Sequence, residues 1–218
     1  MVRKSWLLLA VLMLVVGCSE DSPDTPEVDS PLLLPPIEDS LVNNFVLSME
    51  AMSYDDLAFI LHEDFRLSFL QSTMDDWSGS DHPLTGDGFD RDAMLGIHAN
   101  LFGEVEGMDS NGFVIPYVES ISFSVFDKEG AWVPVAEGNA FFDDYPEAYR
   151  ARYNALIHFN NPNYHRWEVD QTLDVVAVPI VSGETTGWQL LGIYGYSQFS
   201  ALATDNVSYD SVLAMYRF

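Results

Sequence analysis

Cysteine and basic residues are scarce in this chain. Its 218 residues include one cysteine, Cys18, and nine lysines and arginines against 34 acidic residues, which gives a formal net charge of −25. One thiol cannot close a disulfide within the chain or build a thiolate metal site, so packing must stabilise the fold. A surface this acidic repels phosphate backbones, and we therefore expect no nucleic-acid partner.

The sequence also lacks the local patterns that mark common cofactor sites. It has no nucleotide-binding glycine loop and no internal repeat. His62 has no second histidine at a metal-binding spacing, and Asp87, Asp90 and Asp92 do not follow the alternating pattern of a calcium loop. Helix capping explains these aspartates better, and we expect neither a metal nor another cofactor.

The first 17 residues have the layout of a secretory signal. Arg3 and Lys4 precede an apolar run over 6–16, which is shorter than the roughly 20 residues that span a bilayer. The ending Val-Val-Gly-Cys resembles the lipobox of bacterial lipoproteins. This resemblance implies that residues 1–17 are a lipoprotein signal peptide, cleaved before Cys18, and that Cys18 carries lipid, with acyl chains such as palmitate. The alternative is an ordinary signal peptide or an anchor helix with an incidental cysteine.

The residues after Cys18 predict where the protein is held. Ser19 follows the cysteine, and in the proteobacterial lipoproteins that the motif resembles, serine at this position permits transfer to the outer membrane. Residues 18–37 contain five prolines, five acidic residues and no basic residue, which predicts an extended, self-repelling linker. We therefore expect a lipid-anchored protein of the bacterial cell envelope, with the outer membrane favoured, that carries one globular domain over 38–218.

Helical periodicity dominates the first half of this domain. Apolar residues at helical spacing predict a pair of helices within 39–61, the second of them opened by the capping residue Ser53. Alternating residues predict a strand over 65–70, and the polar, glycine-rich residues 72–88 predict a loop. A third helix is expected over 90–103, because aspartate precedes its apolar stripe and glycine ends it.

The second half shows the twofold alternation of strands. The pattern predicts four strands that begin near residues 120, 153, 167 and 188, and a terminal helix over 208–216. The third of these strands is continuously apolar at 175–178, so its middle should be covered on both faces. Helices followed by antiparallel strands indicate the α+β fold class, with three helices of the N-terminal half packed on one face of a curved antiparallel sheet.

This order of elements resembles the nuclear-transport-factor-2-like, or SnoaL-like, superfamily. The residues that carry the resemblance are the 39–61 helix pair, Leu61 to Phe69, Phe89 to Arg91, Asn100 to Phe102 and the long strands after Tyr153. The resemblance implies a cystatin-like roll, in which a cone-shaped sheet holds a mostly apolar pocket at its open end. Members that resemble ketosteroid isomerase need a carboxylate shortly after the second helix, where this chain has Arg66-Leu67-Ser68.

Four side chains are candidates for lining such a pocket. His158 lies on a strand whose other face is apolar, so it could point into the cone as an acid, a base or a ligand contact, or be a solvated or hydrogen-bonded structural histidine. His98 lies near the apolar stripe of the third helix, either in the pocket or in the core. Trp188 and Tyr194 lie on the last predicted strand and could line the pocket or pack in the core.

The absence of a convergent catalytic set favours a binding function. We predict a non-catalytic envelope lipoprotein whose cone-shaped pocket binds a small apolar ligand or a protein partner, with a homodimer through the sheet face as a further option. The alternative is an isomerase or dehydratase that uses a pocket acid or base such as His158, and a third possibility is a structural envelope subunit. A sealed cone would favour a structural role, and an open one with His158 beside a buried acid would favour catalysis.

Overall fold

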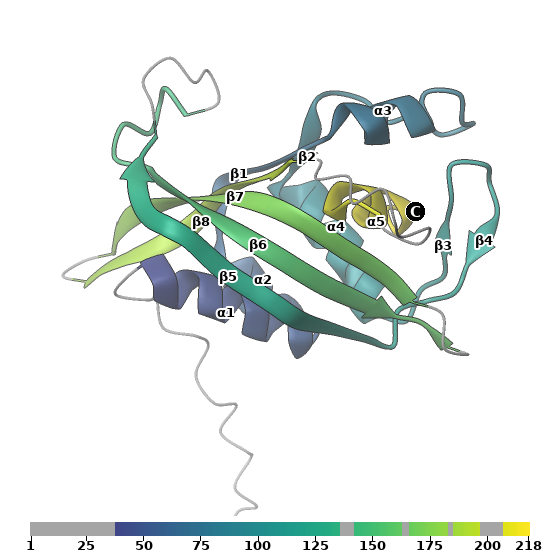
Figure 1. The fold of residues 1–218 in the computed structure, drawn as a ribbon, viewed down its shortest axis with the longest axis horizontal. Helices are drawn as coiled ribbons and strands as arrows, with labels where there is room; N and C mark the ends of the chain where they lie inside the picture. The colour runs from purple at the N-terminus through teal and green to yellow at the C-terminus, as the bar shows by residue number, and fades with distance from the viewer. Residues whose placement is uncertain (1–37, 136–141, 163–165, 183–184, 197–206) are drawn as a thin grey trace, which may run out of the picture. The chain divides into compact units, whose positions relative to one another are not determined.

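The computed structural model describes residues 38–135, 142–162, 166–182, 185–196 and 207–218 (Figure 1). The expected signal peptide, Cys18 and the linker lie outside these residues. Within them, the chain forms a six-stranded sheet, a separate two-stranded sheet and five helices. None of the described helices combines the length and the apolar character that crossing a bilayer requires.

Side-chain caps explain where most helices begin. The helices are α1 (Glu38–Glu50), α2 (Tyr54–Ile60), α3 (Gln71–Trp77), α4 (Arg91–Phe102) and α5 (Tyr209–Met215). Ser53, Asp90 and Ser208 each accept a hydrogen bond from a backbone N–H in the first turn of the helix that follows, which satisfies a donor that the helix itself leaves unpaired. These three helix starts were predicted from the sequence and are confirmed.

The main sheet has the strand order β2-β1-β8-β7-β6-β5. Its strands are β1 (Leu61–Ser68), β2 (Gly88–Asp90), β5 (Ser120–Pro134), β6 (Tyr149–Asn160), β7 (Arg166–Ser182) and β8 (Thr185–Tyr196), and the short β3 (Gly107–Met108) and β4 (Val114–Ile115) pair separately. Neighbours are antiparallel except for β1 and β8, which run parallel. The first long strand of the chain therefore lies beside the last.

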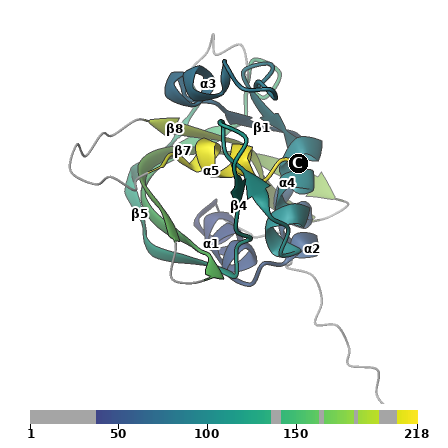
Figure 2. The ribbon, with the colours of Figure 1, turned by 90° about the vertical axis from the view of Figure 1, so that its right-hand side faces the viewer.

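Helices α1, α2, α4 and α5 lie on one face of the curved sheet, which we call the inner face (Figure 2). Along β6, every second residue from Ala151 to Phe159 is at most 4% exposed and belongs to the main core, together with residues of α1, α2, α4 and α5. The intervening residues of β6 point to the opposite side, which we call the outer face. This arrangement confirms the predicted α+β class with a curved, mostly antiparallel sheet and helices on one side.

Residues 72–88 are not the continuous loop that their composition predicts. They contain most of α3 and the start of β2, and β1 begins at Leu61, four residues before the predicted strand. Helix α3 has no side-chain cap, and tertiary contacts hold it instead: Thr73 is buried and its hydroxyl lies 2.9 Å from that of Ser211 on α5, while Trp77 is 3% exposed. A local sequence pattern cannot indicate such support, because Ser211 lies 138 positions away from Thr73 in the chain.

Candidate functional site

The interior between sheet and helices is occupied by the C-terminal helix. Tyr209, Val212, Leu213 and Tyr216 are each at most 2% exposed and belong to the main core. The hydroxyl of Tyr216 donates a hydrogen bond to the carbonyl of Pro116 over 2.7 Å, which fixes the end of α5 against the segment before β5. Helix α5 is thus part of the core between the sheet and the other helices.

A residual hollow beside α5 is too small for a ligand. It is lined by Leu67, Ser68, Gln171, Leu173, Ile193, Gly195, Tyr209 and Asp210, and it has no room for a sphere the size of water. The side-chain oxygen of Gln171 accepts a hydrogen bond from the backbone N–H of Tyr209 over 2.9 Å. A Cβ atom at Gly195 would lie 2.1 Å from the Gln171 amide nitrogen, so glycine is what allows Gln171 to reach α5.

His158 lies on the outer face of the sheet, turned away from the interior. Its Nδ1 is 3.2 Å from an Arg166 nitrogen, and its Nε2 is 3.8 Å from a carboxylate oxygen of Glu168. Because Ile157 and Phe159 on either side of it are fully buried in the core, the strand must direct His158 to the other face. The expectation that it points into a cone is therefore wrong.

The other three candidates do not line one pocket with His158. His98 is fully buried in the core on α4, where Nδ1 donates to the carbonyl of Met94 over 2.7 Å and burial lowers its pKa to about 4. Trp188 packs against the main core, edge-on to Tyr149. Tyr194 packs against a smaller cluster on the outer face, and burial raises its pKa.

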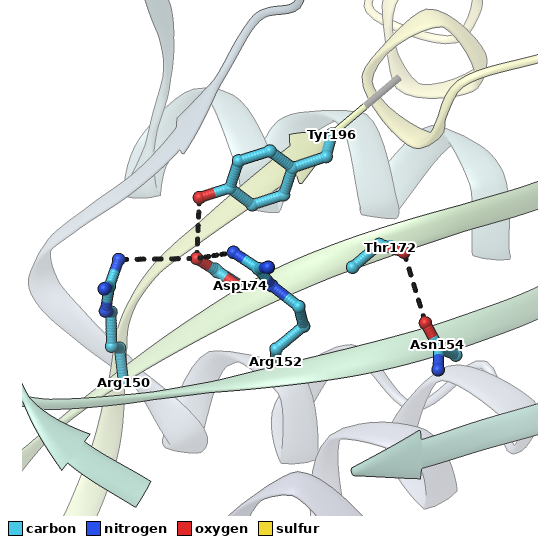
Figure 3. Close-up of polar contacts among 6 residues, drawn as sticks. All are labelled: Arg150, Arg152, Asn154, Thr172, Asp174 and Tyr196. Carbon is cyan, nitrogen blue, oxygen red and sulfur yellow. Dashed lines mark hydrogen bonds and ion pairs between the residues drawn. The ribbon is translucent and has the colours of Figure 1, made fainter. Parts of the chain in front are cut away.

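A cluster of hydrogen-bonded polar side chains on the outer face surrounds Asp174 (Figure 3). Arg152 donates to both of its carboxylate oxygens, over 2.8 and 3.3 Å, and Tyr196 donates its hydroxyl over 2.7 Å. Arg150 approaches the same carboxylate at 3.6 Å. The Asp174 side chain is 5% exposed, whereas those of Arg150 and Arg152 are 46% and 44% exposed. A buried carboxylate therefore holds two arginines that face solvent.

The register of the strands explains why these side chains meet. Arg152 is directly opposite Asp174 in the β6–β7 pair, and Arg150 is opposite Val176, one step further on the same face. Next to them, Asn154 is opposite Thr172, whose hydroxyl donates a hydrogen bond to the side-chain oxygen Oδ1 of Asn154 over 3.2 Å. Cross-strand partners on one face lie close enough for such contacts.

The cluster is suited to fixed charge and not to proton transfer. The hydrogen bonds and the charge of Asp174 raise the pKa of Arg152 above its already high value. Burial, followed by the hydrogen bond to Asp174, raises the pKa of Tyr196. Arg152 therefore stays positive and Tyr196 stays neutral near pH 7, and neither group is poised as a general acid or base at that pH.

Sequence reasoning missed this cluster. Two features could have indicated it: Arg150 and Arg152 are two residues apart on a strand, and Asp174 interrupts the apolar run at 173–178. A charged residue inside an apolar strand is buried only when it is paired, so Asp174 predicts a basic partner on a neighbouring strand. Among the described residues, no group of three or more histidine, cysteine, aspartate or glutamate side chains is arranged to hold a metal ion.

A separate cleft of about 510 Å³ lies between the turn after α3 and the β3–β4 hairpin. Its lining residues are Trp77, Gly79, Ser80, Asp81, His82, Met108, Asp109, Ser110, Asn111 and Gly112. Most of these are polar or glycine, whereas pockets for small apolar molecules are lined mainly by hydrophobic side chains. The cleft therefore does not provide the apolar pocket that the sequence predicts.

Comparisons with known proteins reach only remote structural neighbours. No protein-family model matches the chain, and no curated protein matches it in sequence. A Novosphingobium aromaticivorans protein named as a proposed scytalone dehydratase is similar over 74% of this chain and 81% of its own, with 10% identity and a TM-score of 0.46. A Caulobacter vibrioides protein with a cystatin-like fold covers 75% and 89%, with 12% identity and a TM-score of 0.42.

A third neighbour is an NTF2-like protein of unknown function from Rhodospirillum rubrum. It is similar over 72% of this chain and 94% of its own, with 13% identity and a TM-score of 0.38. The names NTF2-like and cystatin-like denote the group of folds that the sequence resembles. At identities this low, no activity of these neighbours transfers to this chain.

Proposed function

We propose that this protein is a lipid-anchored, non-catalytic protein of the bacterial cell envelope that binds a protein partner through the outer face of its sheet. The observation that carries the proposal is the burial of α5 in the interior, where the hollow lined by described residues has no room for a sphere the size of water. A binding function then needs another surface. The outer face supplies one in the solvent-facing arginines around Asp174.

The composition of the outer face supports this choice. Arginine and tyrosine are enriched among the residues that contribute most to protein interfaces, and Arg150, Arg152 and Tyr196 lie together here. The face also bears both signs of charge, with Arg166 beside Glu168 at 3.0 Å. In a chain of net charge −25, a face with balanced charge is where a second acidic protein, including a second copy, meets the least repulsion.

The anchor half of the proposal rests on the lipobox-like Val-Val-Gly-Cys ending and is tested by Cys18→Ser. Because the thiol is the proposed lipid acceptor, the variant should lose palmitate labelling and leave the membrane fraction or remain unprocessed. The measurement is metabolic labelling with radioactive palmitate followed by fractionation. A Ser19→Ala chain serves as the control and should still be labelled. Equal labelling of Cys18→Ser and of the unmodified chain would contradict the anchor.

Site-specific photocrosslinking in the native cell tests the binding half. We expect p-benzoylphenylalanine in place of the exposed Asp170, on the outer face of β7, to yield one discrete protein adduct. The same residue in place of Leu47, which is 48% exposed on α1, should yield none. Mass spectrometry of the adduct separates a second copy from a different protein. Absence of an adduct at both positions, or equal adducts at both, would contradict an outer-face interface.

A further inference from the structure

Basic residues gather on the outer face of an otherwise acidic protein. The chain has nine lysines and arginines, and strand register places Arg66, Arg150, Arg152 and Arg166 on this one face. Two of them, Arg150 and Arg152, are next to each other on the same side of β6, since residues two apart on a strand share a face. Among the described residues, only the carboxylate of Asp174 contacts both.

Asp174 orients the two arginines without neutralising both. Its carboxylate already accepts hydrogen bonds from Arg152 and Tyr196, and its side chain is almost completely buried. Arg150 lies at the longer distance of 3.6 Å and keeps nearly half of its side chain exposed. Arg150 therefore keeps N–H groups that face solvent, although Glu129 on β5 is directly opposite Arg152 on the same face and adds a second carboxylate nearby.

The arrangement is preorganised for binding. The guanidinium carbon of Arg152 lies 4.6 Å from the centre of the Tyr196 ring, so a cation–π contact holds it in addition to its ion pair. A planar guanidinium whose orientation is already fixed loses less entropy when it binds an anion, and its fork of N–H groups matches the two oxygens of a carboxylate.

We propose that Arg150 and Arg152 form a binding site for a single carboxylate group; this inference rests on the proposed use of the outer face as the binding surface. A carboxylate presents two oxygens to the N–H groups of the arginines, and it adds only one negative charge to a face that already bears Asp174 and Glu129. Phosphate groups with two or more charges are disfavoured, because the net charge of −25 and the nearby carboxylates of Asp174 and Glu129 repel them. The carboxylate belongs either to an acidic side chain of a partner or to a small organic acid.

Binding to three defined probes tests the site in the full-length protein, purified in a non-ionic detergent. The probes are glutarate, the peptide acetyl-Glu-Glu-Glu-amide and its glutamine counterpart, measured by isothermal titration calorimetry. We expect at least one carboxylate probe to bind saturably and the glutamine peptide not to bind. Binding of glutarate identifies a small-acid site, whereas binding of the acidic peptide alone identifies a partner side chain.

Arginine variants locate the site. Arg150→Gln should weaken binding about tenfold, which corresponds to the loss of one charge-assisted hydrogen bond. The variant keeps the closer Arg152–Asp174 pair, so the chain should still fold. Arg150→Lys, which keeps the charge and loses the fork, should fall in between. Arg166→Gln removes the same charge from the same face beside Glu168 and should change affinity less than twofold.

Two outcomes would overturn the inference. If Arg166→Gln weakens binding as much as Arg150→Gln, the probes respond only to net charge. If no carboxylate probe binds while the crosslink at Asp170 persists, the outer face is an interface but the arginine pair is not a carboxylate site. Loss of that crosslink alone, with carboxylate binding retained, contradicts the proposed protein partner instead.

Discussion

Replacement of Leu213 by alanine is expected to lower the free energy of unfolding by about 2–5 kcal/mol, the range for removing a large aliphatic side chain from a core that cannot collapse around the cavity. Leu213 lies on α5, is fully buried and belongs to the main core. Equilibrium denaturation with urea, followed by tryptophan fluorescence, measures the loss. The prediction follows directly from α5 being part of the core and not a surface appendage.

Leu47→Ala is the matched control for this experiment. Leu47 is also a helical leucine, but it is 48% exposed on α1, so its truncation should cost less than about 1 kcal/mol. A similar small loss in both variants would show that α5 is only loosely held in solution. In that case the interior would be accessible after all, and the proposal that binding occurs on the outer face would lose its main support.

Local patterns in the sequence are sufficient to predict where three helices begin and where most of the long strands lie. A cap depends on residues a few positions apart, as between Asp90 and the N–H of Ala93, and a strand face depends on every second residue, as along β6. Both relations join residues that are only a few positions apart in the sequence. The α+β class follows from the order of the helices and strands that are predicted in this way.

Local patterns do not predict whether the curved sheet encloses a pocket or a helix. Residues 208–216 were correctly expected to form a helix, but nothing in their pattern says that Tyr209 would meet Gln171 or that Tyr216 would reach Pro116. These contacts join segments 38 and 100 positions apart. Whether a curved sheet encloses a pocket or a helix depends on them, and so the predicted apolar pocket was an inference from resemblance alone.

To predict the cluster on the outer face, one must know the pairing register of the strands as well as the alternation of residues along each strand. Alternation alone places Arg152 and Asp174 each on some face of its own strand, and only the pairing of β6 with β7 makes them neighbours. A register shift between Val176 and Ala177 in the β7–β8 pair further changes which residues of β8 share that face. The error at His158 has a related cause: its strand has one apolar face, and the histidine belongs to the other.

The buried imidazole of His98 is expected to make the stability of this protein sensitive to acid. It is fully buried, and burial lowers its pKa from 6.5 to about 4, only partly offset by its hydrogen bond to the Met94 carbonyl. Its Nε2 has no hydrogen-bond partner among the described residues, so a proton there would be unsatisfied. The folded state therefore holds His98 neutral at pH 7.

This shift predicts a defined dependence of stability on pH. Between pH 6.5 and about 4 the unfolded chain binds the His98 proton and the folded chain does not, so stability falls as the pH falls through this window. At roughly 1.4 kcal/mol per pH unit, the contribution lost is about 3 kcal/mol. His98→Leu removes the titrating group, and the carboxylates titrate equally in both chains. The unfolding free energy of the unmodified chain minus that of the variant should therefore fall by about 3 kcal/mol from pH 7 to pH 4. Urea denaturation at four pH values measures this difference. If the unfolding free energies of the two chains change with pH in parallel, His98 has the same pKa in the folded and unfolded states, and the core around α4 admits water.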